Sequence, residues 1–189
     1  LVACGQNEPV PPTPSASEYM ERGMDHYEQG ELDQAASEFE EAIRLDPGFV
    51  EAHYNLGLVY ADQGEFDSAI AKHEKAIELA PDLAEAHNGL GNAYYNLGRV
   101  DEALVSYQEA VRLNPSFADA FFNLGRAYGV IDRYADSLAA YLEANRLNPG
   151  DFEILHNIGV AYIKQGMPNE ASVAWEQAID VNPDFAETH

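Results

Sequence analysis

The sequence predicts an all-α solenoid made of five stacked helix-turn-helix units. Columns of prolines and glycines recur at a step of 34 residues, and no insertion breaks the phase. Each 34-residue window also holds two runs of apolar residues at helical spacing, as expected for a repeat architecture. The prolines are Pro47, Pro81, Pro115, Pro149 and Pro183, and the glycines are Gly23, Gly57, Gly91, Gly125 and Gly159.

The repeat phase divides the chain into a tail, five windows and the start of a sixth. Residues 1–15 form a proline-rich tail or linker, and residues 186–189 begin the sixth window. The five windows are 16–49, 50–83, 84–117, 118–151 and 152–185.

Within a window, a first helix, a tight turn, a second helix and a proline stop follow one another. In the window 50–83, Gly64 suits a left-handed helix end, and Phe66 starts the second amphipathic run. Pro81 ends that run, because proline disfavours helix in the residue before it. Small residues such as Gly57 let the two helices approach closely. The apolar positions of this window are Ala52, Leu56, Val59, Tyr60, Phe66, Ala69, Ile70, His73, Ala76 and Ile77.

Three positions depart from the repeated pattern. Asp132 replaces the inter-helix glycine of the fourth window. Pro168 stands at the start of the fifth window's second helix, where a first-turn proline is tolerated. His73 occupies a column that is aromatic elsewhere, with Phe39, Tyr107, Tyr141 and Trp175.

The repeated motif resembles the tetratricopeptide repeat family over 170 of the 189 residues, five windows of 34. The matching residues of one window are Asn55, Leu56, Gly57, Tyr60, Gly64, Phe66, Ala69, Ala76 and Pro81. The resemblance implies a right-handed superhelix whose first helices line a concave face. It also implies that this face binds peptides or partner domains, as a scaffold without chemistry of its own.

Charge and composition exclude several function classes. The 33 acidic and 10 basic residues give a formal net charge of −23, which disfavours nucleic acids and anionic lipid surfaces. Hydrophobic residues make up 46%, which is enough for a folded core. The single cysteine excludes an intrachain disulfide and a Cys-rich metal site. No apolar run is long enough for a transmembrane helix.

The tetratricopeptide resemblance places the partner-binding residues at six window positions that face the groove. Asparagines there can donate to and accept from a peptide backbone, and aromatic rings offer stacking faces. The carboxylates favour a neutral to basic protein or peptide, and we expect no binding to acidic C-terminal tails. The alternative is that Asn55, Asn123 and Asn157 serve helix packing. The expected groove residues are Glu51, Tyr54, Asn55, Glu85, Asn88, Asn92, Tyr95, Asn96, Asp119, Phe122, Asn123, Arg126 and Asn157.

No motif indicates an enzyme, a cofactor or a metal. His53 and His87 share one column, but the other windows fill that column with Tyr19, Phe121 and Leu155, so packing is the better interpretation. A zinc site needs three or four ligands, which this column does not supply. No Ser-His-Asp pattern or phosphate-binding loop is present. We therefore expect no catalytic residue, no cofactor and no metal ligand.

The beginning of the chain resembles a bacterial lipobox. Leu1, Val2 and Ala3 precede Cys4, whose thiol would carry the lipid anchor, and Gly5 in place of Asp fits outer-membrane or surface display. The prolines that follow would form a semi-rigid spacer. We thus expect a secreted or envelope-attached bacterial protein, as a processed form or a fragment. The alternative is a chance tetrapeptide on a tail.

The two ends of the repeat array differ in polarity. Glu18, Arg22 and Asp25 replace apolar residues on one face of the first helix, as in a capped end. The last helix instead carries residues that expect a follower, and these are Trp175, Ala178 and Ile179, with Phe185 beyond them. Our leading prediction is an envelope scaffold that binds a partner in its groove. The alternative is a structural subunit that assembles end to end through these surfaces and the tail.

Overall fold

The computed structural model describes residues 14–182, and these residues form helices joined by short turns, with no strand among them. The all-α solenoid predicted from the repeat is therefore confirmed. Each first and second helix begins at the expected step of 34 residues. The helices are α1 Ala16–Glu28, α2 Leu32–Leu45, α3 Val50–Asp62, α4 Phe66–Leu79, α5 Ala84–Asn96, α6 Val100–Leu113, α7 Ala118–Val130, α8 Tyr134–Leu147, α9 Phe152–Lys164 and α10 Pro168–Val181.

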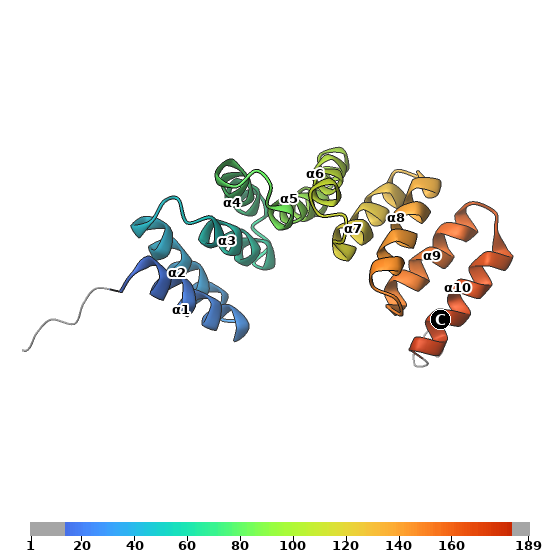
Figure 1. Cartoon of the computed structure of the whole chain (residues 1–189), viewed down its shortest axis with the longest axis horizontal. Coiled ribbons are helices and arrows are strands. Elements are labelled where there is room, and N and C mark those ends of the chain that lie inside the picture. The colour runs from blue at the N-terminus through green and yellow to red at the C-terminus, as the bar shows by residue number, and fades with distance from the viewer. Residues whose placement is uncertain (1–13, 183–189) are drawn as a thin grey trace, which may run out of the picture.

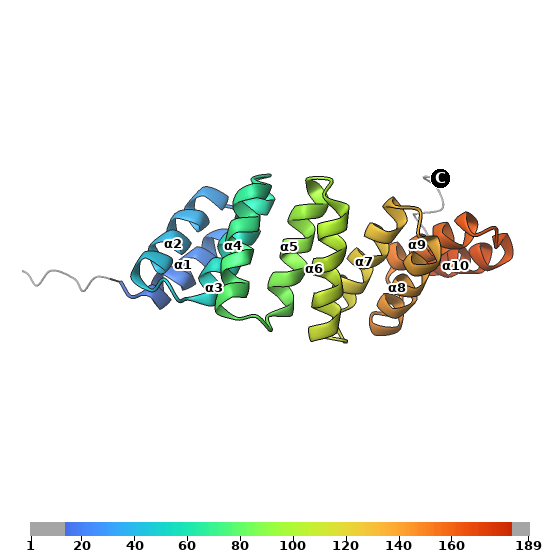
Figure 2. The same cartoon turned by 90° about the horizontal axis from the view of Figure 1, so that it is seen from above.

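The helix pairs follow one another along an arc, from α1 and α2 at one end to α9 and α10 at the other (Figure 1). Viewed from above, the pairs remain in sequence order along the long axis (Figure 2). Every helix packs against its neighbours in the chain, and α5 also contacts both α3 and α7. The first helices thus touch one another along the inner side of the arc, and this side positions the site described below.

The turn between the paired helices uses the left-handed backbone region. Gly64 has a φ of 80°, as its place after α3 predicts, and glycine carries no Cβ that this region would strain. Asp132 takes the same place after α7 with a φ of 59°. Its carboxylate accepts a hydrogen bond from the Tyr134 hydroxyl, two residues later. The turn geometry is therefore kept in the fourth repeat although the glycine is absent.

The close approach of paired helices depends on a ring that lies over a glycine. A Cβ atom at Gly91 of α5 would lie 2.6 Å from Cδ1 of Tyr107 in α6. At Gly159 of α9, a Cβ atom would meet the indole of Trp175 in the same way. The alanines Ala69 and Ala76 are fully buried, which confirms their expected role at helix contacts.

His73 fills this ring position in the second repeat. Its side chain is fully buried, between Gly57 of α3 and Gly89 of α5. Neither ring nitrogen has a hydrogen-bond partner within residues 14–182. Burial lowers the pKa of His73 to about 4, because the imidazolium would lose its hydration. The ring is therefore neutral at physiological pH.

The two ends of the described chain are finished differently. At α1, Ser15 Oγ accepts from Glu18 N at 3.2 Å and Glu18 Oε2 accepts from Ser15 N at 2.6 Å, which forms a capping box. Arg22 and Asp25 are exposed on the same helix. No helix within residues 14–182 is long and apolar enough to cross a bilayer.

At α10, the helix begins at Pro168, as predicted. Trp175 Nε1 donates to the carbonyl of His156 at 3.1 Å, so this indole packs inside its own repeat. Ala178 is fully buried as well, whereas Ile179 is 38% exposed. Among the residues expected at the C-terminal surface, Ile179 is therefore the exposed one. Phe185, Cys4 and the proline-rich tail lie outside the described residues.

Candidate functional site

Two hollows lie between the first helices on the inner side of the arc, and both are bounded by α5, α7 and α9. The first, of about 360 Å³, lies at the N-terminal turns of α7 and α9; we call it the acidic pocket. The second, of about 420 Å³, lies towards their C-terminal ends; we call it the basic pocket. The acidic pocket is lined by Asn88, Asn92, Asp119, Phe122, Asn123, Asp151, Glu153 and Ile154. The basic pocket is lined by Tyr95, Arg126, Gly129, Val130, Asp132, Tyr134, Ser137, Tyr141, Asn157, Val160, Ala161 and Lys164.

The asparagines of the acidic pocket are held by hydrogen bonds. Asn123 of α7 donates its Nδ2 to Oδ1 of Asn88 in α5 at 3.1 Å, so one amide pair bridges two repeats. Asn92 accepts a hydrogen bond from the Tyr107 hydroxyl at 2.8 Å. These contacts fix the amide orientations and leave part of each amide free for a ligand.

The carboxylates of the acidic pocket divide into one structural group and two open groups. Asp151 caps α9, since its Oδ1 accepts from the backbone N–H groups of Glu153 and Ile154 at 2.9 and 3.2 Å. Asp119 and Glu153 are exposed and form no ion pair within residues 14–182. Their negative charge therefore remains available to a cationic group.

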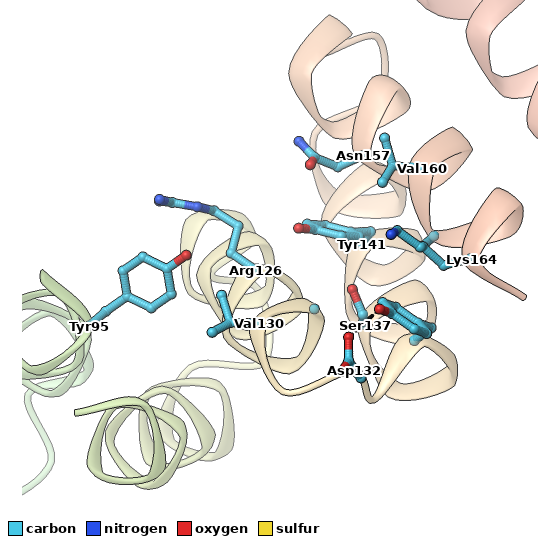
Figure 3. Close-up of a pocket in the computed structure, with 12 residues that line it drawn as sticks. Tyr95, Arg126, Val130, Asp132, Ser137, Tyr141, Asn157, Val160 and Lys164 are labelled. Atoms are coloured by element: carbon cyan, nitrogen blue, oxygen red, sulfur yellow. Dashed lines mark hydrogen bonds between the residues drawn. The ribbon is translucent and has the colours of Figure 1, made fainter. Parts of the chain in front are cut away.

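The basic pocket presents a guanidinium between aromatic rings. The Cζ of Arg126 lies 4.8 Å from the ring centroid of Tyr95 and 5.9 Å from that of Phe122. Such contacts attract the cation to the ring faces and restrain the side chain. Figure 3 shows Arg126 of α7 and Lys164 of α9 on opposite sides of the Tyr141 ring in this view. Asp132 is the only carboxylate among the lining residues, and it accepts from Tyr134.

Tyr141 forms the floor of the basic pocket. Its ring centroid lies 5.6 Å from that of Phe122, and its side chain is buried. Burial raises the pKa of Tyr141 to about 12, so the hydroxyl keeps its proton at neutral pH. A neutral phenol adds no negative charge beside Arg126 and Lys164.

The structure brings most of the expected groove residues together. Five of them line neither pocket, namely Glu51, Tyr54, Asn55, Glu85 and Asn96. Tyr54 instead packs against the ring of His73, with centroids 5.7 Å apart. The eight expected residues that line the two pockets are Asn88, Asn92, Tyr95, Asp119, Phe122, Asn123, Arg126 and Asn157.

The packing alternative for the asparagines holds in part. Asn55 and Asn157 each donate Nδ2 to the backbone carbonyl four residues earlier, at 2.8 Å. These bonds occupy one amide hydrogen within the same helix. Asn123 instead bridges to a neighbouring repeat, so its amide belongs to the pocket wall rather than to its own helix.

Sequence reasoning missed several pocket residues. Lys164 lies at the thirteenth window position, in the same column as Asn96, so the groove pattern already contained its signal. Tyr134, Ser137 and Tyr141 lie on α8, a second helix, and the groove pattern of first helices gave no reason to include them. They reach the pocket because α8 packs between α7 and α9.

The histidines of the first helices serve the inter-repeat turns. The Nε2 atoms of His53 and His87 lie 3.1 and 3.0 Å from the backbone carbonyls of Pro47 and Pro81. His53 is also buried, which agrees with a packing position. In the part of the chain that the structure describes, no three His, Cys, Asp or Glu side chains are placed to hold a metal ion.

A protein-family comparison matches nearly the whole chain. The model described as the C-terminal domain of cilia and flagella-associated protein 70 matches residues 3–189. No curated protein sequence matches significantly.

Similar solved structures support the fold. A crystal structure of MamA is 28% identical with a TM-score of 0.78, and the match covers 92% of this chain and 95% of that one. YrrB, described as a TPR protein with an unusual peptide-binding site, is 25% identical with a TM-score of 0.73, over 90% of this chain and 88% of its own. A MamA structure from Desulfovibrio magneticus RS-1 is 20% identical with a TM-score of 0.81, over 89% and 96% of the two chains, and shows the fold alone.

Proposed function

Since the chain belongs to the tetratricopeptide-repeat family of the C-terminal domain of cilia and flagella-associated protein 70, we propose that it is a non-enzymatic scaffold that binds a peptide segment of a partner protein in its concave face. The main support is the pair of adjacent pockets, which are open and carry uncompensated charges. YrrB, which has a similar fold, is itself described as having a peptide-binding site. Repeat arrays use such concave surfaces for binding.

The charge of the groove favours a ligand with a cationic residue. Glu51, Glu85, Asp119 and Glu153 are all exposed at the same position of successive first helices. The net charge of −23 adds a long-range attraction for basic segments. An electrostatic contribution of this kind raises association rates and weakens as salt is added.

Selection from a displayed peptide library, followed by titration of the selected peptides, tests this function. We expect enriched peptides to contain Lys or Arg. The double variant Asn88→Ala and Asn123→Ala should weaken their binding by about tenfold, since it removes the inter-repeat amide pair and its free polar atoms. Gln34→Ala, at an exposed position of α2, is the matched control. Binding that is equally strong in all variants would show that the groove is not the site.

The location of the protein is a separate proposal. We place it on a bacterial envelope or outside the cell, attached through a lipid on Cys4, because residues 1–5 resemble a lipobox. Mass spectrometry of the membrane-bound protein should find an acyl modification at Cys4, and Cys4→Ser should release the protein into the soluble fraction. An unmodified Cys4 on a membrane-bound protein would contradict this attachment.

End-to-end assembly remains the second candidate function, and one observation favours it. Ile43, Ile77 and Val111 are half-buried in the inner repeats, whereas Ile179 in the same column is more than one-third exposed. A copy that docks on this face would bury it as an inner repeat does. Light scattering over a range of concentrations should then show growth that Ile179→Glu abolishes. A mass that stays monomeric at every concentration excludes this assembly.

A further inference from the structure

The cations of the chain are distributed unevenly between neutralised and open positions. Six of the ten Lys and Arg side chains form ion pairs with an acid three residues away. All six lie on second helices or at their N-caps. Arg126 and Lys164 form no ion pair within residues 14–182, and both line the basic pocket. A chain with 33 acids thus leaves two cations open at one place on its inner face.

The geometry of Arg126 suits a carboxylate. Its guanidinium is held at the faces of Tyr95 and Phe122, and no protein acceptor occupies its N–H groups within the described residues. A restrained guanidinium loses less conformational entropy when it binds, and its planar fork matches the two oxygens of a carboxylate. Lys164 supplies a second positive charge across the same hollow.

The acidic pocket lies beside the basic pocket along the same two helices. From Phe122 to Gly129 on α7, and from Glu153 to Val160 on α9, the separation is seven residues. At the rise of an α-helix this corresponds to about 10 Å between the two pockets. An extended peptide advances about 3.3 Å per residue, so about three residues span this distance.

We propose that the groove recognises an extended peptide segment of a partner protein that carries opposite charges about three residues apart. The Asp or Glu side chain docks against Arg126 and Lys164, and the Lys or Arg side chain docks against Asp119 and Glu153. The proposal rests on the proposed peptide-binding function and names its ligand. A multiply acidic tail is not accommodated, because its other carboxylates would meet Asp119 and Glu153.

Synthetic peptides with one Lys and one Glu in a neutral Ala and Ser background test the inference. Nuclear magnetic resonance titration of the isotope-labelled full chain detects even millimolar binding. We expect the peptide with three-residue spacing to bind more tightly than those with one- or six-residue spacing. Replacing its Glu by Gln should weaken binding by about tenfold, the usual effect of losing a hydrogen bond to a charged group.

Protein variants assign the effect to the pocket. Arg126→Gln should weaken the Lys–Glu peptide by about tenfold and leave the Lys–Gln peptide almost unchanged. Arg146→Gln is the matched control, because Arg146 is ion-paired with Glu143 on α8. Lys164→Gln provides the same test if Arg126→Gln loses helical content. Equal binding of the two peptides, or equal effects of Arg126→Gln and Arg146→Gln, would overturn the inference.

Failure of the inference is distinguishable from failure of the proposed function. If peptides bind irrespective of their Glu residue and the Asn88→Ala, Asn123→Ala variant still weakens them, the groove binds peptides and the carboxylate assignment is wrong. If no peptide perturbs the signals of α5, α7 or α9, both statements are wrong.

Discussion

The imidazole of His73 occupies the space that Gly57 leaves open, and a Cβ atom at Gly57 would lie 2.6 Å from its Cε1. The same ring faces Gly89 of the next repeat, so one neutral side chain joins three helices. Both of its nitrogens are buried without partners in the described chain. The contact therefore combines tight packing with a desolvated polar group, and the free energy of unfolding should depend on pH through it.

The His73→Phe variant should be less sensitive to acid than the natural protein. Above pH 6.5, His73 is neutral in the folded and unfolded chain, and pH has no effect through it. As the pH falls from 6.5 towards the folded pKa of about 4, the unfolded chain binds a proton that the folded chain refuses, so stability is lost. Relative to pH 7, the natural protein should lose about 2 kcal/mol more than the variant at pH 5. Urea unfolding of both proteins at the two pH values measures this difference, and parallel losses would contradict it.

Gly91→Ala should destabilise the chain by about 2 kcal/mol. The new Cβ would lie 2.6 Å from the Tyr107 ring, and overpacking of this kind costs more than the better helix propensity of alanine returns. Gly129→Ala is the matched control in α7, since its Cβ would meet only Ser137 Oγ at 3.5 Å. This control should gain about 0.5 to 1 kcal/mol from helix propensity. Thermal unfolding of the two variants decides whether the ring contact sets the sign.

Asp132→Gly should stabilise the chain by about 0.5 kcal/mol. Asp132 holds a φ of 59°, which costs a non-glycine residue about 1 kcal/mol, and the hydrogen bond from Tyr134 offsets part of that cost. The reverse change Gly98→Asp, at the equivalent turn after α5, should destabilise by about 1 kcal/mol. Chemical unfolding of both variants and of Tyr134→Phe separates the backbone effect from the hydrogen bond.

Asp151→Ala should cost about 1 kcal/mol, because Asp151 caps two backbone N–H groups of α9. Asp119→Ala removes an equal charge from the same pocket but no cap, so its effect should stay within about 0.5 kcal/mol. Equal losses in the two variants would mean that the charge, rather than the cap, stabilises this helix.

The sequence predicted the fold closely because its repeat is strict. The glycine, alanine and proline columns report backbone geometry directly, since a left-handed turn or a helix contact admits few residue types. Gly64 and Pro168 took the places expected of them. Asp132 showed that a column can lose its usual residue without losing its backbone conformation.

The candidate site was less predictable, because it depends on side chains from different helices. The position of Arg126 in the groove followed from its window position, but its two ring contacts did not. Lys164 was available in the same pattern and was overlooked among the acidic columns. The role of Tyr141 depends on how far α8 reaches between α7 and α9, which only packing determines.

The buried imidazole near the middle of the array has a consequence for how the chain comes apart. In a linear stack, each unit is held only by its neighbours, so a locally weakened joint divides the molecule into separately melting blocks. Protonation of His73 would loosen the junction of α3, α4 and α5 while the flanking pairs keep their contacts. Mild acid is therefore expected to give a hinged, two-block molecule before it gives an unfolded one, with amide exchange fastest at that junction.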